Sequence, residues 1–180
     1  ARFAGIKDPL RQKYAAQFSL MDDAIGEALA ALAASGQEQR TLVFFFSDNG
    51  GPVGINGSDN TPLRGAKGSV YEGGVRVACI MKWPAVIKPG TVAGDVACSI
   101  DLFDTILDAS ARGAKEQPDR PREKPRDGWS LQGVLSGEKL KDRPLFWHYP
   151  HYANQGSRPG GAVRKGDYKL IEYYEDGRRE

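Results

Sequence analysis

Apolar residues near the N-terminus recur every three or four positions. They are Tyr14, Phe18, Met21, Ile25, Leu29 and Leu32. This spacing places side chains along one face of an α-helix. Gly36 follows the stripe, and glycine commonly ends a helix because it adopts the left-handed conformation without strain. The pattern therefore predicts a helix that packs through its apolar face and ends near residue 35.

The next segment, Thr41 to Phe46, is a continuous apolar run rather than an alternating one. Such runs are typical of strands buried on both faces, as in a parallel sheet covered by helices. A helix followed by such a strand is half of an α/β unit. We therefore predict an α/β fold. A second strand is expected from Val75 to Trp83.

A second helix is expected after Ser99. Its apolar face would be formed by Ile100, Phe103, Ile106 and Leu107. Residues 112–127 are rich in charge and proline, which predicts a surface linker. Trp129 and Leu131 then bring the chain back to the core.

The C-terminal part has the pattern of a small antiparallel sheet. Pro144 to Tyr149 is an aromatic, strand-like segment. Ala162 to Arg164 and Tyr168 to Ile171 flank the turn sequence Lys165-Gly166-Asp167, which predicts a β-hairpin. The chain thus divides into an α/β portion, residues 1–139, and a small antiparallel β subdomain, residues 140–180.

Composition narrows the class of protein. The 180 residues include 25 Lys and Arg and 23 Asp and Glu, so the net charge is +2. This balance removes the electrostatic argument for a nucleic-acid partner. The apolar runs are too short to span a membrane. The first residue is not Met and the last residues stop within a polar pattern, so we expect a piece of a longer polypeptide that holds part of a site.

Asp48 and Asn49 follow the apolar strand directly. In open α/β sheets, ligands bind beyond the carboxyl ends of the strands. Carboxylate and amide oxygens are hard ligands that suit Ca²⁺ or Mg²⁺ rather than zinc. Gly50 and Gly51 would allow close backbone approach. An ordinary polar turn is the alternative, because Asp-Asn-Gly is also good turn chemistry.

A second candidate cluster surrounds Lys67. This lysine lies between small residues in Pro-Leu-Arg-Gly-Ala-Lys-Gly, so an anion can approach it. A lysine beside a metal would place two positive centres against one oxyanion. Arg64 could bind the same anion with bidentate geometry. The alternative is a solvated basic turn. The spacing is not that of a P-loop.

The two histidines, His148 and His151, lie in the aromatic segment around Pro150. We predict that His151 contacts substrate, with a purely structural role as the alternative. The chain contains no recognisable Ser or Cys nucleophile motif. It therefore offers parts that bind a cation and an oxyanion, without a nucleophile.

Several of these segments together resemble the C-terminal half of a type I sulfatase of the alkaline-phosphatase-like superfamily. The most specific are Ser-Asp-Asn-Gly-Gly at 47–51, Pro-Leu-Arg-Gly-x-Lys-Gly at 62–68 and Tyr-Glu-Gly-Gly-Val-Arg at 71–76. Asp127 to Leu131 and Ala162 to Ile171 follow in family order. The resemblance implies part of a sandwich with a mostly parallel sheet and a small C-terminal antiparallel sheet.

The resemblance also implies a sulfuric ester hydrolase that acts on a sulfated small molecule or sugar. It implies a site around one divalent cation, usually Ca²⁺, with Asp48 and Asn49 as two ligands and Lys67 holding a sulfate oxygen. The formylglycine nucleophile and the other ligands lie upstream in the family, so this chain alone is expected to be inactive and to work with the missing N-terminal half of the same polypeptide. Family members are often exported, periplasmic or lysosomal.

Two alternatives stay open from the sequence. One is a phosphonate or phosphate ester hydrolase of the same superfamily. Such enzymes often use two metals with histidine ligands, and no histidine lies near Asp48 or Lys67 in this sequence. The other is a non-catalytic carbohydrate-binding module.

Overall fold

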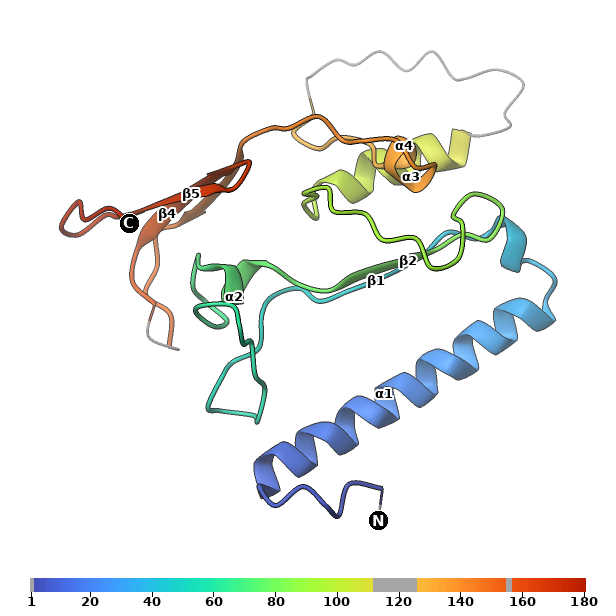
Figure 1. Cartoon of the computed structure of the whole chain (residues 1–180), viewed down its shortest axis with the longest axis horizontal. Helices are drawn as coiled ribbons and strands as arrows, with labels where there is room; N and C mark the ends of the chain where they lie inside the picture. Colours follow the sequence, from blue (N-terminus) through green and yellow to red (C-terminus); the bar gives the residue numbers. More distant parts are fainter. Residues whose placement is uncertain (1, 112–125, 155–156) are drawn as a thin grey trace.

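The structure is a computed structural model that describes residues 2–111, 126–154 and 157–180. In the view of Figure 1, a long helix, α1 (Pro9–Ala34), lies on one side of a two-stranded sheet. Two helices, α3 (Asp101–Ala111) and α4 (Gln132–Leu135), lie on the other side. A separate three-stranded sheet holds the C-terminal part of the chain. None of the helices described is both long and apolar enough to cross a membrane.

Helix α1 ends where the sequence predicts and begins at Pro9, before the predicted stripe, but this apolar stripe is not covered. The Asp8 carboxylate caps the first turn by accepting from the Leu10 N–H at 2.9 Å. The helix ends before Ser35, and Gly36 has a φ of 69°. No residue of α1 is buried, and Phe18 is 51% exposed. The predicted packing is therefore absent among the described residues, which supply no partner surface for this stripe.

A short 3-10 helix, Glu38–Arg40, leads into the first sheet, which consists of β1 (Val43–Phe46) and β2 (Cys79–Lys82). The two strands are antiparallel, with Val43 opposite Lys82 and Phe46 opposite Cys79. The expected parallel pairing is not found in the part of the chain that the structure describes. Phe45 and Phe46 are 37% and 40% exposed, so β1 is not buried on both faces. An apolar run indicates that both faces avoid water, but it does not specify which strand pairs with it.

The second predicted strand is shorter than expected at its start. Glu72–Val75 forms a single helical turn, α2, and β2 begins only at Cys79. The reason is local packing, because the Gly73 N–H donates to the Arg64 carbonyl at 2.7 Å. A Cβ at Gly73 would also clash with the Gly65 carbonyl, so this turn is held against the preceding loop.

Helix α3 begins where the sequence predicts, but it buries its polar face instead of its apolar face. Asp101 and Thr105 are fully buried, whereas Phe103 is 60% exposed. The Asp101 carboxylate accepts from the Trp129 N–H at 2.8 Å, and the Thr105 hydroxyl accepts from the Leu131 N–H at 2.9 Å. The polar face thus binds the backbone of the segment that leads into α4, whereas the apolar face stays largely exposed.

Two arginines neutralise the acids of this buried face. Arg143 pairs with Asp101, and Arg126 pairs with Asp104. The Arg143 guanidinium also lies 4.8 Å from the centre of the Trp129 ring. Paired in this way, the carboxylates are stable inside the protein, where an unpaired charge would be costly.

The C-terminal sheet confirms the predicted strand and hairpin. Its strands are β3 (Leu145–Tyr149), β4 (Gly160–Lys165) and β5 (Tyr168–Tyr173), in the order β3-β4-β5 and all antiparallel. The hairpin turn lies at Gly166-Asp167, with Lys165 opposite Tyr168. The division into two domains stays a prediction, and residues 112–125 of the predicted linker lie outside the described residues.

A small core joins this sheet to the loop that follows Lys67. Its buried members are Val70 from the loop and Ala162, Ile171 and Tyr173 from the sheet. Partly buried aromatic residues pack around them: Tyr71, Trp147 and Tyr149. The C-terminal sheet therefore lies directly against the segment that carries the candidate lysine.

Candidate active site

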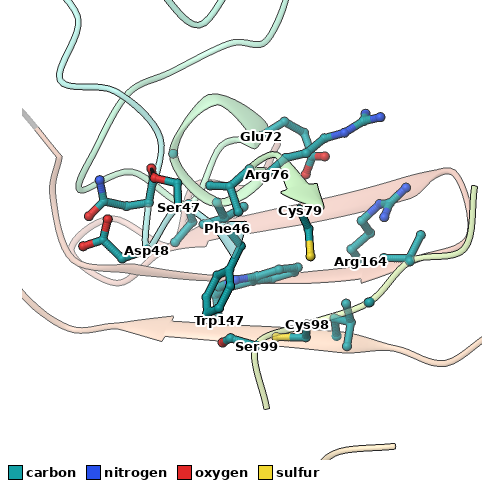
Figure 2. Close-up of a pocket in the computed structure, with 18 of the residues that line it drawn as sticks. Phe46, Ser47, Asp48, Glu72, Arg76, Cys79, Cys98, Ser99, Trp147 and Arg164 are labelled. Atoms are coloured by element: carbon teal, nitrogen blue, oxygen red, sulfur yellow. Dashed lines mark hydrogen bonds between the residues drawn. The ribbon is translucent and has the colours of Figure 1, made fainter. Parts of the chain in front are cut away.

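A cavity of about 1220 Å³ opens between the end of β1, the Lys67 segment and the C-terminal sheet. Asp48, Asn49 and Lys67 all line it, as do Trp147, His148 and Tyr149 from β3. Figure 2 shows Asp48 at one side of this group, Trp147 near its centre and Arg164 at the other side. The structure thus brings the predicted cation ligands and the predicted lysine to one cavity.

The turn after β1 is held by its own polar groups. The Ser47 hydroxyl donates to the Asn49 carbonyl at 2.7 Å, and the Asn49 side-chain amide donates to the Gly50 carbonyl at 2.9 Å. The carboxamide oxygen of Asn49 is then the side-chain atom that can serve as a ligand. The Gly50 N–H donates to Gly74 at 3.0 Å, and a Cβ at position 50 would clash with the Gly73 carbonyl. Glycine is therefore required where this turn meets α2.

Calcium binds six to eight oxygen atoms, and both Asp48 and Asn49 offer oxygen donors of the right chemistry. Within residues 2–111, 126–154 and 157–180 there is no group of three or more His, Cys, Asp or Glu side chains arranged to hold a metal. Asp48 and Asn49 therefore fit a hard divalent cation, but only as two ligands of a larger set.

Lys67 is tied to the same turn through its backbone. Its N–H donates to the Gly51 carbonyl at 3.2 Å. A third residue, Asn60, bonds to Gly51 and also to Gly65, two residues before the lysine. Sequence reasoning missed Asn60, because an asparagine in a Gly-, Asn- and Pro-rich loop looks like ordinary turn chemistry.

Arg64 lies outside the described lining of the cavity. Its guanidinium bonds to Glu180 at 2.9 Å and to the Tyr71 hydroxyl at 2.9 Å, and it stacks 4.0 Å from the centre of the Tyr71 ring. The Tyr71 hydroxyl also bonds to the Tyr173 hydroxyl. These contacts join the Lys67 segment to the C-terminal sheet. A role for Arg64 in substrate binding stays a prediction without a contact to support it.

His151 also lies outside the described lining, is exposed, and has its ring 5.6 Å from that of Tyr149. The histidine that lines the cavity is His148, whose Nδ1 lies 2.6 Å from the Tyr174 hydroxyl. His148 belongs to β3, which forms the sheet side of the cavity, whereas His151 follows Pro150 beyond the end of this strand. Contact between His151 and substrate likewise stays a prediction.

The sheet side of the cavity carries a paired acid. Glu72 lines the cavity and forms a 2.8 Å ion pair with Lys169 of β5, which is 14% exposed. The Lys169 ammonium also lies 4.7 Å from the centre of the Trp147 ring. Because Glu72 is neutralised, it does not oppose an anion that approaches Lys67.

Two cysteines, Cys79 and Cys98, also line the cavity. Desolvation raises the pKa of the Cys79 thiol above its usual value. A raised pKa keeps the thiol protonated at neutral pH, and only the thiolate is strongly nucleophilic. This agrees with the absence of a nucleophile motif in the sequence.

An α/β chain with oxygen donors and a lysine around one cavity is the kind of protein that acts on an anionic group. Comparison with family models makes the class specific. The model of the sulfatase family matches residues 2–111. A second model, the C-terminal region of N-sulphoglucosamine sulphohydrolase, matches residues 66–179. The chain belongs to the sulfatase family of hydrolases and corresponds to the C-terminal portion of a sulfatase.

Curated relatives agree with this assignment. The chain is 39% identical to a sulfatase of Formosa agariphila over 91% of its own length and 32% of the relative's length. It is 37% identical to mouse steryl-sulfatase and 36% identical to human arylsulfatase A, covering 24% and 28% of those proteins. The chain thus spans a third or less of these three relatives.

Solved structures show the same fold. A crystal structure of Ps i-CgsB in complex with k-i-k-neocarrahexaose matches 99% of this chain and 38% of that protein, with a TM-score of 0.79 and 27% identity. The PsFucS1 sulfatase from Pseudoalteromonas matches 83% of this chain and 28% of that protein, with a TM-score of 0.63 and 29% identity.

Proposed function

We propose that the full-length protein hydrolyses sulfate esters, and that this chain supplies Lys67 as a catalytic residue and Asp48 and Asn49 as ligands of a Ca²⁺ ion. The observation that carries the proposal is that all three side chains line one cavity. Membership in the sulfatase family supports the chemistry. The nucleophile, a formylglycine, is expected elsewhere in the polypeptide.

Charge explains what these residues would do. Cleavage of a sulfate ester builds negative charge on the sulfuryl and leaving-group oxygens. An ammonium group aimed at those oxygens stabilises the transition state more than the ground state. Lys67 lines the cavity, and its backbone is fixed to the turn by the bond to Gly51. A bound Ca²⁺ would add a second positive centre and orient the sulfate group.

We further propose that the ester is carried by a sugar. Trp147 and Tyr149 place aromatic side chains on the sheet side of the cavity, and aromatic residues with an apolar body and a polar end suit sugar rings. One structural relative is a complex with k-i-k-neocarrahexaose, and one curated relative is an N-acetylgalactosamine-6-sulfatase. Steryl-sulfatase is more similar to this chain than the N-acetylgalactosamine-6-sulfatase is, at 37% against 34% identity, so the aromatic side of the cavity is the stronger argument.

The first test is Lys67→Ala in the full-length enzyme. Loss of one donor to a developing oxyanion lowers the rate by about 10²–10³-fold, and we expect this fall in kcat with an aryl sulfate while the fold is kept. Lys88→Ala, at an exposed loop position, is the matched control. Wild-type kcat in Lys67→Ala refutes the assignment. A higher kcat/KM on the matching aryl phosphate would favour the phosphate ester alternative.

The second test concerns the metal. We expect Asp48→Ala to abolish stoichiometric Ca²⁺ binding by the full-length protein, because a carboxylate is the strongest ligand that this chain offers. Metal analysis and calorimetry measure the stoichiometry. Asp167→Ala, in the exposed hairpin turn, serves as the control. Unchanged calcium content in Asp48→Ala would remove Asp48 from the ligand set.

A further inference from the structure

We infer that Asn60 is a positioning residue that sets the distance between the Asp48-Asn49 turn and Lys67. The inference rests on the proposed function, since it assigns a purpose to that distance. Asn60 itself lies outside the described lining of the cavity. It would act on the reaction only through the spacing between Lys67 and the Asp48-Asn49 turn.

The Asn60 side chain pairs with both polar backbone groups of Gly51, as a residue on a neighbouring antiparallel strand would. Its Oδ1 accepts from the Gly51 N–H at 3.0 Å, and its Nδ2 donates to the Gly51 carbonyl at 2.9 Å. Both polar backbone groups of Gly51 are therefore bound by one carboxamide. Gly51 is two residues from Asn49, so this pairing holds the end of the cation-binding turn.

The same carboxamide reaches the lysine segment. Nδ2 also donates to the Gly65 carbonyl at 3.1 Å, and the Gly51 carbonyl accepts the Lys67 N–H at 3.2 Å. Hydrogen bonds thus connect Asn60 to Gly51, Asn60 to the Lys67 segment, and Gly51 to Lys67. The backbone of Asn60 is fixed as well, because its carbonyl accepts from the Leu63 N–H at 2.8 Å.

The two segments that Asn60 connects are packed closely at Gly51 and Gly65. A Cβ at Gly51 would lie 2.5 Å from the Ser58 hydroxyl and 3.1 Å from Asn60 Oδ1. Gly65 has a φ of 91°, a conformation that other residues adopt only with strain, and a Cβ there would lie 2.7 Å from the Ser69 hydroxyl. Small residues therefore allow the two segments to approach, and Asn60 fixes how closely they do so.

The far side of the lysine segment is fixed independently. Val70 is buried in the core of the C-terminal sheet, and the Tyr71 hydroxyl bonds to Tyr173. The position of Lys67 relative to the sheet is thus set after the lysine, and its position relative to the turn is set before it. Misplacement of a catalytic group by about 1 Å can cost about 10²-fold in rate.

The test uses Asn60→Asp in the full-length enzyme with an aryl sulfate. A carboxylate can still accept from the Gly51 N–H, but it cannot donate to the Gly51 and Gly65 carbonyls. We expect kcat to fall by about 100-fold, with KM changed by less than about threefold, because the spacing between Lys67 and the turn is altered while the residues that line the cavity are kept. Asn56→Asp is the control with expected wild-type kcat, because that side chain only accepts from the Ser58 N–H.

A double-mutant cycle separates positioning from a general structural role. If Asn60 acts through Lys67, then Asn60→Asp added to Lys67→Ala lowers kcat by no more than about twofold further. A full multiplicative loss in the double variant overturns the inference and leaves the role of Lys67 intact. Wild-type kcat in Lys67→Ala alone overturns the proposed function instead. If Asn60→Asp does not fold, Asn60→Gln, which keeps the amide but displaces it by one methylene, is judged by the same criterion.

Discussion

The junction between the Lys67 segment and the C-terminal sheet differs sharply from the layers around β1 and β2. At the junction, Val70, Ile171 and Tyr173 are 8%, 4% and 6% exposed. In the layers, α1 buries no residue, and Phe103 on α3 is 60% exposed. Both regions carry clear apolar patterns in the sequence. Among the described residues, Trp83 and Leu131 are also buried, but the apolar faces of α1 and α3 are left largely exposed.

This difference indicates which parts of the site are self-sufficient. The segments that hold Asp48, Asn60 and Lys67 are bound to one another and to the C-terminal sheet by hydrogen bonds and a small core. The helices present apolar faces to solvent, which is costly for a protein. Since the chain spans 32% of its Formosa agariphila relative, we expect those faces to be covered by other residues of the full polypeptide.

The largest effect is expected from a matched pair of isoleucines. Ile171→Ala should lower the free energy of unfolding of the 180-residue chain by about 2–4 kcal/mol, because a buried isoleucine leaves a cavity. Ile106→Ala should change it by less than about 0.5 kcal/mol, because Ile106 is 51% exposed on a helix where alanine is favoured. Urea unfolding of both variants measures the difference.

Equal losses for the two variants would contradict this comparison, because they would mean that the apolar face of α3 is covered within the chain. The same two substitutions, Ile171→Ala and Ile106→Ala, can also be compared in the full-length protein. There, a cost at Ile106 that approaches the cost at Ile171 is the expected sign that other residues cover α3.

A smaller effect is expected from two ion pairs. Lys169→Met leaves Glu72 without its partner at a largely buried position, and should cost about 1–2 kcal/mol of stability. Arg2→Met breaks a pair with Asp23 in which the two side chains are 67% and 59% exposed, and should cost less than about 0.5 kcal/mol. Chemical unfolding at low and at moderate salt measures both. A salt-dependent loss at Arg2 equal to that at Lys169 would show that burial does not control these pairs.

The smallest effect is a change in the response to acid. The Tyr71 hydroxyl donates to Glu180 at 2.8 Å and, together with the positive charges of Arg64 and Arg178, holds the pKa of that carboxyl below its usual value of 4.5. A carboxyl with a lowered folded-state pKa stabilises the fold above about pH 4.5, and this contribution is lost as the pH falls through the lowered pKa.

Glu180→Gln should therefore lower the stability above about pH 4.5, where the ionised carboxyl contributes, and reduce the further loss of stability as the pH falls below this value. Thermal unfolding across this range measures it. Glu27→Gln, at an exposed position on α1, is the control. Identical acid profiles for Glu180→Gln and the unchanged chain would mean that the contact with Tyr71 does not persist in solution.

The local pattern of apolar, polar and turn residues in the sequence predicted most of the helices and strands. The end of α1, the start of α3 and the hairpin of β4 and β5 follow from helical spacing, helix stop and start signals and turn chemistry. The candidate residues Asp48, Asn49 and Lys67 could also be found from the sequence. Asp48 and Asn49 directly follow an apolar strand, where ligands commonly bind, and the motifs that contain all three residues resemble those of the family. They do line a common cavity, although their roles remain proposals.

Partners distant in sequence could not be predicted in this way. Nothing in the pattern of α3 shows that Asp101 and Thr105, rather than Phe103, are buried, because their partners lie in the segment that precedes α4. Likewise, Arg64 looks like an anion-binding residue until the fold brings Glu180 and Tyr71 to it.

The amino-acid sequence by itself determined the local elements, the residue types at the end of β1 and the family, because these depend on neighbours along the chain and on short motifs. Only the tertiary structure decided that β1 pairs with β2 in antiparallel fashion, that His148 rather than His151 lines the cavity, and that Asn60 links Gly51 to the Lys67 segment. The physical reason is that hydrogen bonds and burial between distant segments depend on where the whole chain places them, which no local pattern of polarity specifies.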